Sequence, residues 1–461
     1  MNDLTQGSIV RHLLKTTSFM LVTMVFQTLY FLIDLYWVGR LGKEAVAALS
    51  IAGNLMFVVL ALTQMLAVGT TVLIAQAAGR RDEPAARLVA NQAQVLALVV
   101  GCVFFAVAML SRGLFASSIG ADALIARLTS EYLAWFIPAM ALQFVMAAMA
   151  AALRGTGDFR TGMVIQIATI VINTLLAPVL IFGWGTGVAL GVGGAALATF
   201  IAVAVGICWF AWSFRPARPF LGFSAALLKP RVELWKTMLK IGAPAGAEFA
   251  LMAVYLFLVY AVTRPFGAAA QAGFGIGSRL LQSGFLPVIA IGIAVAPVAG
   301  QNYGARQSRR VRETILTAAW MAGTIMAVFA IVCQVAPEAM IRLFSNEAGV
   351  IAVATEYLRI VSWSFIASGL VFVASGAFQA MGNTMPSMLA SCVRVVVVAV
   401  PVLLLARTPD FQLRWIWYAS VTAIALQTVV SLLLLRRELR RKLAFEPAPV
   451  AASTQPVAVE A

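Results

Sequence analysis

Two acidic residues, Asp34 and Glu248, lie well inside long apolar segments of this 461-residue chain. An ionised carboxylate without a partner costs several kcal/mol in a bilayer, so each is a candidate functional group. A carboxyl group can also take up a proton when it is shielded from water and release it when water returns. The chemistry that these two residues could perform is therefore ion coupling rather than catalysis.

Each acid also has an alternative interpretation. Arg40 follows Asp34 by about 9 Å of helix, close enough to the end of the segment for the carboxylate to be hydrated. Lys236 and Lys240 precede Glu248 and could pair with it near the opposite membrane surface.

Helical spacing groups further residues with these acids. Gln27, Tyr30 and Asp34 are three and four residues apart and share one helix face. In the second half of the chain, Tyr255 matches Tyr30, whereas Glu248 lies about three turns, roughly 16 Å, from the position that matches Asp34. We expect both faces to line a cavity. Asp34 would serve coupling, and Glu248 would attract cationic substrate or act as a second coupling group. Gln27, Tyr30 and Tyr255 would contact substrate.

Arg279 and Arg394 are the basic residues deepest within apolar segments. Each could pair with an acid or bind an anionic part of a substrate, and we include both among the candidate substrate-binding residues. Arg279 could instead extend its side chain to the membrane surface. Arg394 lies deeper, and the sequence identifies no partner for it.

The composition is that of a membrane protein. The chain is 62% hydrophobic and 11% charged, with a mean hydropathy of +0.94. Apolar segments follow one another almost from end to end, which predicts an all-α polytopic membrane protein. The net charge of +15 lies in short loops and does not indicate nucleic-acid binding. Four scattered cysteines and one histidine indicate no metal site, and we expect no cofactor and no enzymatic activity.

Apolar windows between Gly, Pro and charged residues predict about twelve transmembrane helices. The windows at 46–78 and 271–303 exceed what a bilayer requires and predict tilted or bent helices. The predicted spans are 13–38, 46–78, 88–111, 131–153, 161–182, 190–213, 238–263, 271–303, 313–335, 356–380, 387–406 and 414–435.

Lys and Arg are more than twice as frequent in the loops on the side of the N-terminus as in the opposite loops. The positive-inside rule therefore predicts that both termini are cytoplasmic, in a bacterial inner (plasma) membrane. The predicted organisation is an N-terminal six-helix bundle, a cytoplasmic connector, a C-terminal six-helix bundle and a disordered tail. Their predicted bounds are 1–214, 215–237, 238–436 and 437–461.

The two halves are repeats. Gln76 matches Gln301 and Gly157 matches Gly382, each pair 225 positions apart, and further pairs keep this offset. Each unit contains six spans, an even number, so both units enter the membrane from the same side. Parallel repeats of this kind are related by an axis along the membrane normal.

The chain resembles the multidrug and toxic compound extrusion (MATE) transporters over both halves. The residues that carry the resemblance are Asp34 with Gly39-Arg-Leu-Gly42, Ala75-Gln76, Arg154-Gly-Thr-Gly-Asp158, Ile241-Gly-Ala-Pro-Ala-Gly-Ala-Glu248, Ala272-Gly-Phe-Gly-Ile-Gly-Ser-Arg279 and Gly300-Gln-Asn-Tyr-Gly304. The resemblance implies two six-helix bundles in a V around a central cavity. It also implies export of amphipathic or cationic organic compounds in exchange for protons or Na⁺, including drug efflux of the kind that underlies antibiotic resistance.

One position departs from the family pattern. The resemblance implies a cation site of Asp34, Asn173, a second acid and a threonine such as Thr199, but the second acid's position is Ala177. With one formal charge left, a proton suits the site better than a partly dehydrated Na⁺. We therefore predict proton coupling through Asp34 and Asn173, with Na⁺ as the second choice.

Two other functions compete with an efflux antiporter. A flippase for lipid-linked saccharides would need a cavity lined by many basic residues. Arg279 and Arg394 are the two candidates for such a lining, which gives this alternative little support. An integral-membrane enzyme would need clustered His, Asp or Glu at a membrane face, and the sequence lacks one. We expect a monomer whose partners are small-molecule amphipathic or cationic substrates and the lipid bilayer, with no nucleic acid.

Overall fold

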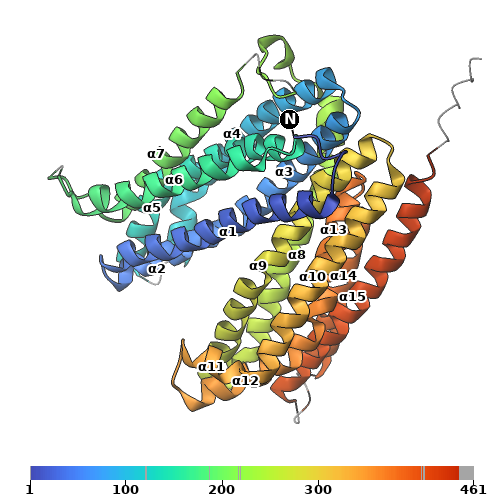
Figure 1. The fold of residues 1–461 in the computed structure, drawn as a ribbon. Helices are drawn as coiled ribbons and strands as arrows, with labels where there is room; N and C mark the ends of the chain where they lie inside the picture. Colours follow the sequence, from blue (N-terminus) through green and yellow to red (C-terminus); the bar gives the residue numbers. More distant parts are fainter. Residues whose placement is uncertain are drawn as a thin grey trace, which may run out of the picture.

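The computed structural model describes residues 2–119, 122–185, 187–215, 218, 220–405, 408 and 411–445. These residues form helices and no strands, arranged as two bundles that diverge in a V (Figure 1). The first bundle contains α1 (Ile9–Gly39), α2 (Lys43–Gly53), α3 (Leu55–Gly79), α4 (Glu83–Ile119), α5 (Ala123–Gly155), α6 (Phe159–Phe182) and α7 (Gly191–Ser213).

The second bundle begins after the short 3-10 helix η1 (Ala225–Leu227). It contains α8 (Val232–Thr263), η2 (Arg264–Phe266), α9 (Ala268–Gly304), α10 (Ser308–Val335), α11 (Pro337–Arg342), α12 (Ala348–Val361), η3 (Ser362–Ser364), α13 (Phe365–Ala380), α14 (Met385–Leu405) and α15 (Leu413–Lys442). Within the described residues, 12 helical segments are long and apolar enough to cross a membrane, which confirms the predicted number and the fold class.

The long apolar windows adopt different structures. The window at 46–78 is broken at Asn54 into α2 and α3, whereas the window at 271–303 remains one helix, α9, that includes Pro287 and Pro297. The window at 356–380 is interrupted by η3, which the sequence did not indicate. Proline is tolerated within α9 because neighbouring groups in a bundle can satisfy the freed carbonyls.

Two predicted boundaries need correction. Helix α15 continues to Lys442, so 437–442 are helical and do not belong to a tail. Helix α8 begins at Val232, so the connector predicted at 215–237 ends earlier. In both places a charged helix end extends beyond the apolar stretch, and a hydropathy window cannot register it. The remainder of the predicted tail, from 446, lies outside the described residues.

The repeat extends to single backbone conformations. Positive φ angles recur at matching positions: 117° and 90° at Gly42 and Gly267, 77° and 69° at Gly157 and Gly382, and 58° and 57° at Arg81 and Arg306. The arginine pair ends α3 and α9 in the same way. The Arg81 and Arg306 amides bond back three residues, and each following amide bonds back five, as in a Schellman motif. The two halves therefore share loop and cap geometry as well as hydropathy.

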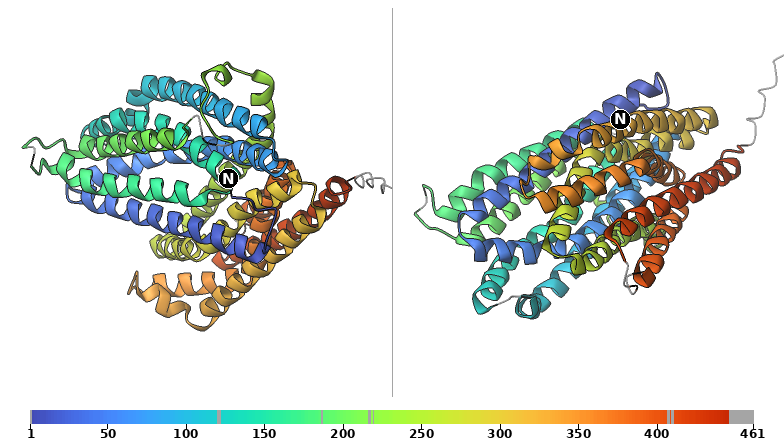
Figure 2. Two further views of the ribbon diagram at one scale, coloured as in Figure 1. Left: turned by 45° about the horizontal axis from the view of Figure 1, so that its top comes forward. Right: turned by 90° about the horizontal axis from the view of Figure 1, so that it is seen from below.

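The bundles join at the end of the molecule that holds the N-terminus (Figure 2). There α3 packs against α8 and α9. Gln76 Nε2 donates a hydrogen bond to the Ala380 carbonyl at 2.9 Å, and Gln301 Nε2 donates to the Gly155 carbonyl at 3.0 Å. These two bonds are repeat-related, because donors and acceptors both keep the 225-residue offset. The opposite ends, with α2 in one bundle and α11 and α12 in the other, lie apart (Figure 1).

The N-terminal segment 2–8 lies across this junction. Asn2 Nδ2 donates to the Gly157 carbonyl at 2.9 Å in the first half. The Leu4 amide donates to Gln301 Oε1 at 3.0 Å, and Asn302 Nδ2 donates to the Leu4 carbonyl at 3.1 Å. This non-helical segment thus connects the two bundles at their closed end.

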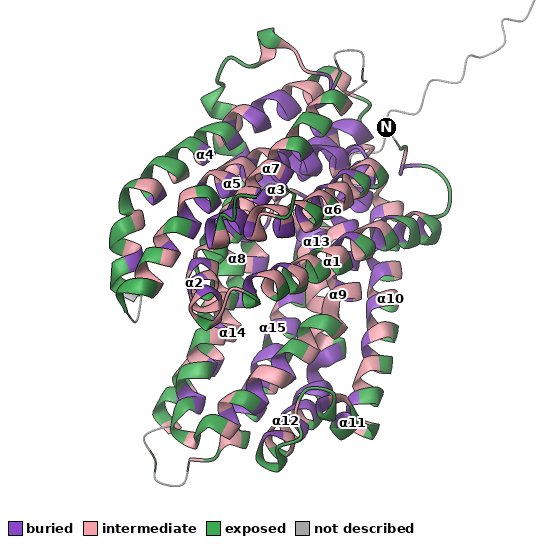
Figure 3. Cartoon of the chain, turned by 90° about the vertical axis from the view of Figure 1, so that its left-hand side faces the viewer, coloured by how far each residue is buried: buried purple, intermediate pink, exposed green. Residues whose placement is uncertain are grey.

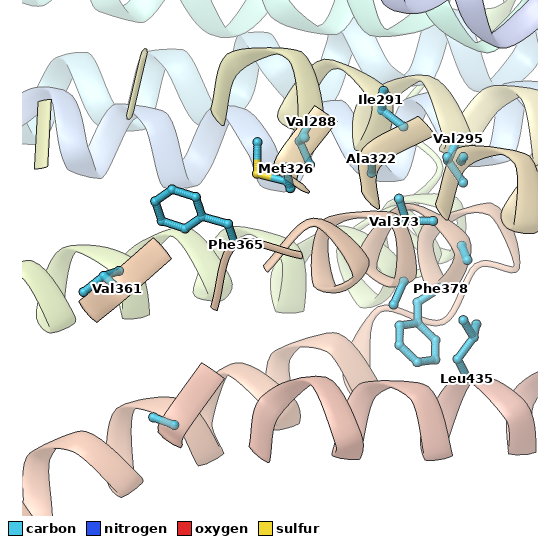
Figure 4. Close-up of a cluster of buried hydrophobic side chains, with 14 of the residues drawn as sticks. Val288, Ile291, Val295, Ala322, Met326, Val361, Phe365, Val373, Phe378 and Leu435 are labelled. Atoms are coloured by element: carbon cyan, nitrogen blue, oxygen red, sulfur yellow. The ribbon is translucent and has the colours of Figure 1, made fainter. Parts of the chain in front are cut away.

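Each bundle has a core of buried apolar side chains, and at the closed end each core includes residues of the other half: Ile9 and Leu13 of α1 join the second core, and Met238 of α8 joins the first. In the second bundle, Val288 and Ile291 of α9 meet Met326 of α10 and Phe365 of α13 (Figure 4). Helix surfaces that face away from these cores carry many large exposed hydrophobic residues (Figure 3). Such an exterior is expected where the surroundings are lipid rather than water.

Candidate functional site

The first bundle contains a polar cluster at the meeting point of α1, α6 and α7. Asn173 Nδ2 donates to Thr199 Oγ1 at 3.0 Å, and the Tyr30 hydroxyl lies 3.1 Å from the same Thr199 oxygen. Asn173 is 3% exposed. The structure thus brings together Asn173 and Thr199, which the resemblance implies for a cation site, and Tyr30, a candidate for substrate contact. Thr199 is the member that holds the cluster together.

Asp34 lies one turn beyond Tyr30 on α1 and is 8% exposed. Its Oδ1 atom is buried and has no hydrogen-bond partner among the described residues. We expected Asn173 to be its polar neighbour, but the Asn173 amide donates to Thr199 instead. The alternative interpretation, in which Asp34 is hydrated near the end of its segment, does not fit this burial.

Ala177, one turn after Asn173, is 1% exposed and belongs to the same apolar core as Val38. A methyl group therefore stands in the core where the family pattern has a second carboxylate. Pro178 follows and has no N–H, so the Thr174 carbonyl lacks its usual helical partner. The site thus combines one carboxylate with neutral oxygen and amide groups.

The second bundle contains a larger polar cluster around Glu248 of α8. Its carboxylate accepts hydrogen bonds from Ser387 at 3.0 and 3.2 Å, from Ser391 at 3.2 Å and from Ser375 at 3.3 Å. Gln427 Nε2 donates to Ser391 at 3.1 Å and continues the network to α15. The lysine alternative is not supported: Lys236 pairs with Glu233 at 2.8 Å, and no ion pair of Glu248 occurs among the described residues.

Helix geometry explains why these groups meet. Ser387, Ser391 and Arg394 are four and three residues apart and form one face of α14, which packs against α8. On α8, Glu248 and Tyr255 are seven residues apart and form the facing surface. The serines meet the carboxylate, and the Arg394 guanidinium carbon lies 4.4 Å from the Tyr255 ring centroid. This cation–π contact gives Arg394 the partner that the sequence could not identify.

Tyr30 and Tyr255 make equivalent contacts in the two halves. Tyr255 donates to Ser420 on α15 at 2.9 Å, as Tyr30 contacts Thr199 on α7. In each half, the first spanning helix is thus tied to the last by a tyrosine hydroxyl.

Two other candidates lie outside the clusters. The side chains of Gln27 and Arg279 are exposed and join neither cluster in this conformation. The positions of Gln27 and Arg279 within apolar segments could not reveal their exposure, because the sequence of a helix does not show which of its faces other helices cover.

Sequence reasoning missed the three serines around Glu248 and their glutamine neighbours. A signal was present, since Ser387 and Ser391 are one turn apart in a window that is apolar except for these serines and Arg394. Nothing local, however, pointed to α8 as their partner. Carboxylate and hydroxyl oxygens can exchange a proton or coordinate a hard cation. No group of three or more His, Cys, Asp or Glu side chains that could bind a metal occurs in the described part of the chain.

The MatE family model matches residues 20–179 and 244–405, one segment in each bundle. The chain belongs to the MatE family. This result confirms the resemblance to multidrug and toxic compound extrusion transporters that the motifs indicated.

Among curated relatives of this MatE chain, "Probable multidrug resistance protein YoeA" of Bacillus subtilis is 28% identical and aligns over 90% of both chains. "Multidrug export protein MepA" of Staphylococcus haemolyticus is 26% identical over 82% of this chain and 83% of its own length. "Probable multidrug resistance protein NorM" of Thermotoga maritima is 25% identical over 89% of this chain and 88% of its own length.

Solved structures share the fold. A multidrug resistance MATE family transporter in an outward-facing conformation superposes with a TM-score of 0.88, at 24% identity over 96% of this chain and 98% of that chain. A MOP superfamily transporter from Pyrococcus furiosus, described as having a binding pocket of reverse polarity, superposes with a TM-score of 0.87, at 24% identity over 95% of this chain and 98% of that chain.

Proposed function

We propose that this protein is a secondary-active multidrug efflux antiporter that exports amphipathic or cationic organic compounds in exchange for protons. Membership of the MatE family and the names of the relatives support the efflux role. The V of two bundles, closed at one end, supports alternating access, in which the bundles rock around a central site.

The burial of Asp34 carries the proposal of proton coupling. Its Oδ1 atom has no hydrogen-bond partner among the described residues, and Ala177 supplies no second charge nearby. An ionised carboxylate is costly in such a place unless a cation neutralises it. A proton does so with no further ligands, whereas Na⁺ would need several oxygen atoms around it. Proton binding would thus favour the occluded arrangement of α1, and hydration of Asp34 would release the proton.

Glu248 has a different environment and a different proposed role. Three serine hydroxyls donate to its carboxylate and favour the ionised form, a stabilisation that the buried Asp34 oxygen lacks. A fixed negative charge in the second bundle suits attraction of a cationic substrate. Arg394 over Tyr255, seven residues along α8, adds a positive group that would select substrates by the position of their charge.

We further propose that both termini are cytoplasmic, in an inner membrane, because basic residues concentrate on the N-terminal side. The V would then open toward the outside. We propose a monomer, since both polar clusters and the cores around them are built from residues of a single chain.

The decisive experiment uses proteoliposomes loaded with a fluorescent organic cation. Efflux is measured with an imposed pH gradient or an imposed Na⁺ gradient, for wild type and Asp34→Asn. We expect the pH gradient to drive wild-type transport and the Asp34→Asn variant to lose that dependence. Strict dependence on Na⁺ in the wild type, with Ala177 unchanged, would falsify proton coupling. Transport of lipid-linked saccharide without either gradient would favour the flippase alternative.

A further inference from the structure

The last turns of α15 carry four arginines on one side. Arg436, Arg437, Arg440 and Arg441, the arginine face, are spaced one, three and one residues apart, and all four are exposed. In the described part of the chain none of their side chains has an ion pair or a hydrogen bond. Four positive charges thus occupy a small area without internal neutralisation.

The opposite side of the same turns is fixed to the bundle. Glu438 is 5% exposed, pairs with Lys442 at 3.3 Å and accepts a hydrogen bond from Asn383 at 2.9 Å. Lys442 Nζ also donates to the Met381 carbonyl at 2.8 Å. Because these contacts prevent rotation of the helix, the arginine face is directed outward from the bundle.

The arginine face continues an apolar surface. Leu426, Val429, Leu432 and Leu433 are exposed on the same side of α15, in the preceding turns. Leu433 and the four arginines line a shallow groove of about 550 Å³. Along one helix side, an apolar stretch that faces lipid therefore passes directly into a cationic groove.

The repeat offers an internal comparison. Helix α7 corresponds to α15, and the positions that match Arg436, Arg437 and Arg440 are Ala211, Trp212 and Arg215. The first bundle therefore lacks the cluster, although it shares the fold. The arginine face is a property of this one helix end and does not follow from the shared architecture.

We propose that the arginine face binds the headgroup of an anionic phospholipid, with the acyl chains along Leu433 and the apolar residues before it. Guanidinium groups bind phosphate through paired, geometrically matched hydrogen bonds, which an ammonium group cannot reproduce. Basic clusters beside a membrane span attract anionic lipid through each added charge. The occupied site would attach the end of the second bundle to the membrane surface.

The test uses the purified full chain in detergent, titrated with fluorescent phosphatidylglycerol or phosphatidylcholine. We expect tighter binding of phosphatidylglycerol, and a loss of about tenfold or more in affinity for the R437Q/R441Q variant. The matched control is R309Q/R312Q, which removes two exposed arginines at the start of α10. We expect this control to bind as the wild type does. The R437K/R441K variant keeps the charge and should show a smaller loss.

Three results would overturn the proposal. Equal affinity for the two lipids would show that the headgroup charge does not contribute to binding. Equal losses in R437Q/R441Q and R309Q/R312Q would reduce the effect to general surface charge. Displacement of the lipid by millimolar inorganic phosphate would identify a free-anion site. If R437Q/R441Q does not fold, R437K/R441K carries the same comparison, and wild-type affinity in that variant would contradict the role of the guanidinium groups.

Discussion

At the scale of single residues, the two embedded acids are held in opposite ways. Asp34 has a buried oxygen without a donor, whereas Glu248 accepts bonds from three serines on two helices. The same side-chain chemistry is thus placed in one environment where a buried oxygen has no donor and in another where three hydroxyl groups donate to the carboxylate. The two sites should therefore respond differently to substitution.

The serines around Glu248 provide the first prediction. In Ser387→Ala, the carboxylate loses its shortest hydrogen bond, which is worth about 1.5–3 kcal/mol for a charged acceptor. We expect weaker transport of cationic substrates and a pH optimum displaced upward, because the ionised carboxylate is less stabilised. The measurement is initial efflux rate against pH in proteoliposomes. Ser283→Ala is the matched control, since Ser283 is exposed and bonds only within its own helix; an equal effect there would contradict the prediction.

Arg394 provides the second prediction. Arg394→Gln removes the cation over Tyr255 and leaves Glu248 as the net charge of this cluster. We expect affinity for monovalent organic cations to rise several-fold and affinity for zwitterionic compounds to fall, as measured by binding titration. Arg279→Gln serves as the control, because Arg279 is exposed and joins neither cluster. Parallel changes in both variants would show that only net charge matters.

At the scale of elements, two repeat-related glutamines, Gln76 and Gln301, hold the closed end together. The N-terminal segment 2–8 adds a contact to one of them. Gln76 and Gln301 each cross to the other half. Gln301 also accepts the Leu4 amide, whereas the segment that matches 2–8 in the second repeat, 227–233, bonds to Gln92 of α4 through Leu227, Lys229 and Arg231. One side of a symmetric closure is thereby reinforced by the chain terminus. Opening of this end requires that the N-terminal segment be released.

We expect Gln301→Ala to destabilise the closed end more than Gln76→Ala does. The first variant loses two hydrogen bonds and leaves the Leu4 amide without its acceptor, at a cost of about 2 kcal/mol, whereas the second loses one bond. The measurement is alkylation of a cysteine placed at Ala75, which is buried at this junction, in a background without native cysteines. Alkylation should be tenfold or more faster in Gln301→Ala than in the background alone. Equal rates in the two glutamine variants would show that the terminal segment contributes nothing.

At the scale of the whole molecule, the two bundles meet backbone to backbone. An added Cβ at Gly304 would overlap the Gln76 carbonyl, and one at Gly79 would overlap the Gln301 carbonyl. These glycines therefore permit an approach that no larger residue allows. The molecule can close at this end because both repeats carry a glycine at the same position.

Alanine substitution tests this closure. Gly304→Ala should prevent full closure and reduce transport by tenfold or more. It should also increase alkylation of the cysteine that replaces Ala75. Gly323→Ala is the matched control, because nothing lies within 4 Å of a Cβ added there. In a helix this control change should be neutral or stabilising by up to about 1 kcal/mol. Normal transport by Gly304→Ala in proteoliposomes would show that the approach is not required.

The sequence by itself determined the features that depend on local pattern. Apolar length predicted the spans and a constant offset predicted the parallel repeat. Of the two acids in apolar segments, Glu248 is the centre of one polar cluster, whereas Asp34 lies one turn from Tyr30 of the other. These signals are readable because each one is contained in a single segment or in a comparison of segments.

Only the tertiary structure decided which groups meet across segments. It placed the Asn173 amide on Thr199, three serines on Glu248 and Arg394 over Tyr255, and it left Gln27 exposed. Several of these contacts join residues more than one hundred positions apart. Helix rotation and bundle packing bring them together, and an apolar segment encodes neither, because in lipid almost every face of a helix can be hydrophobic.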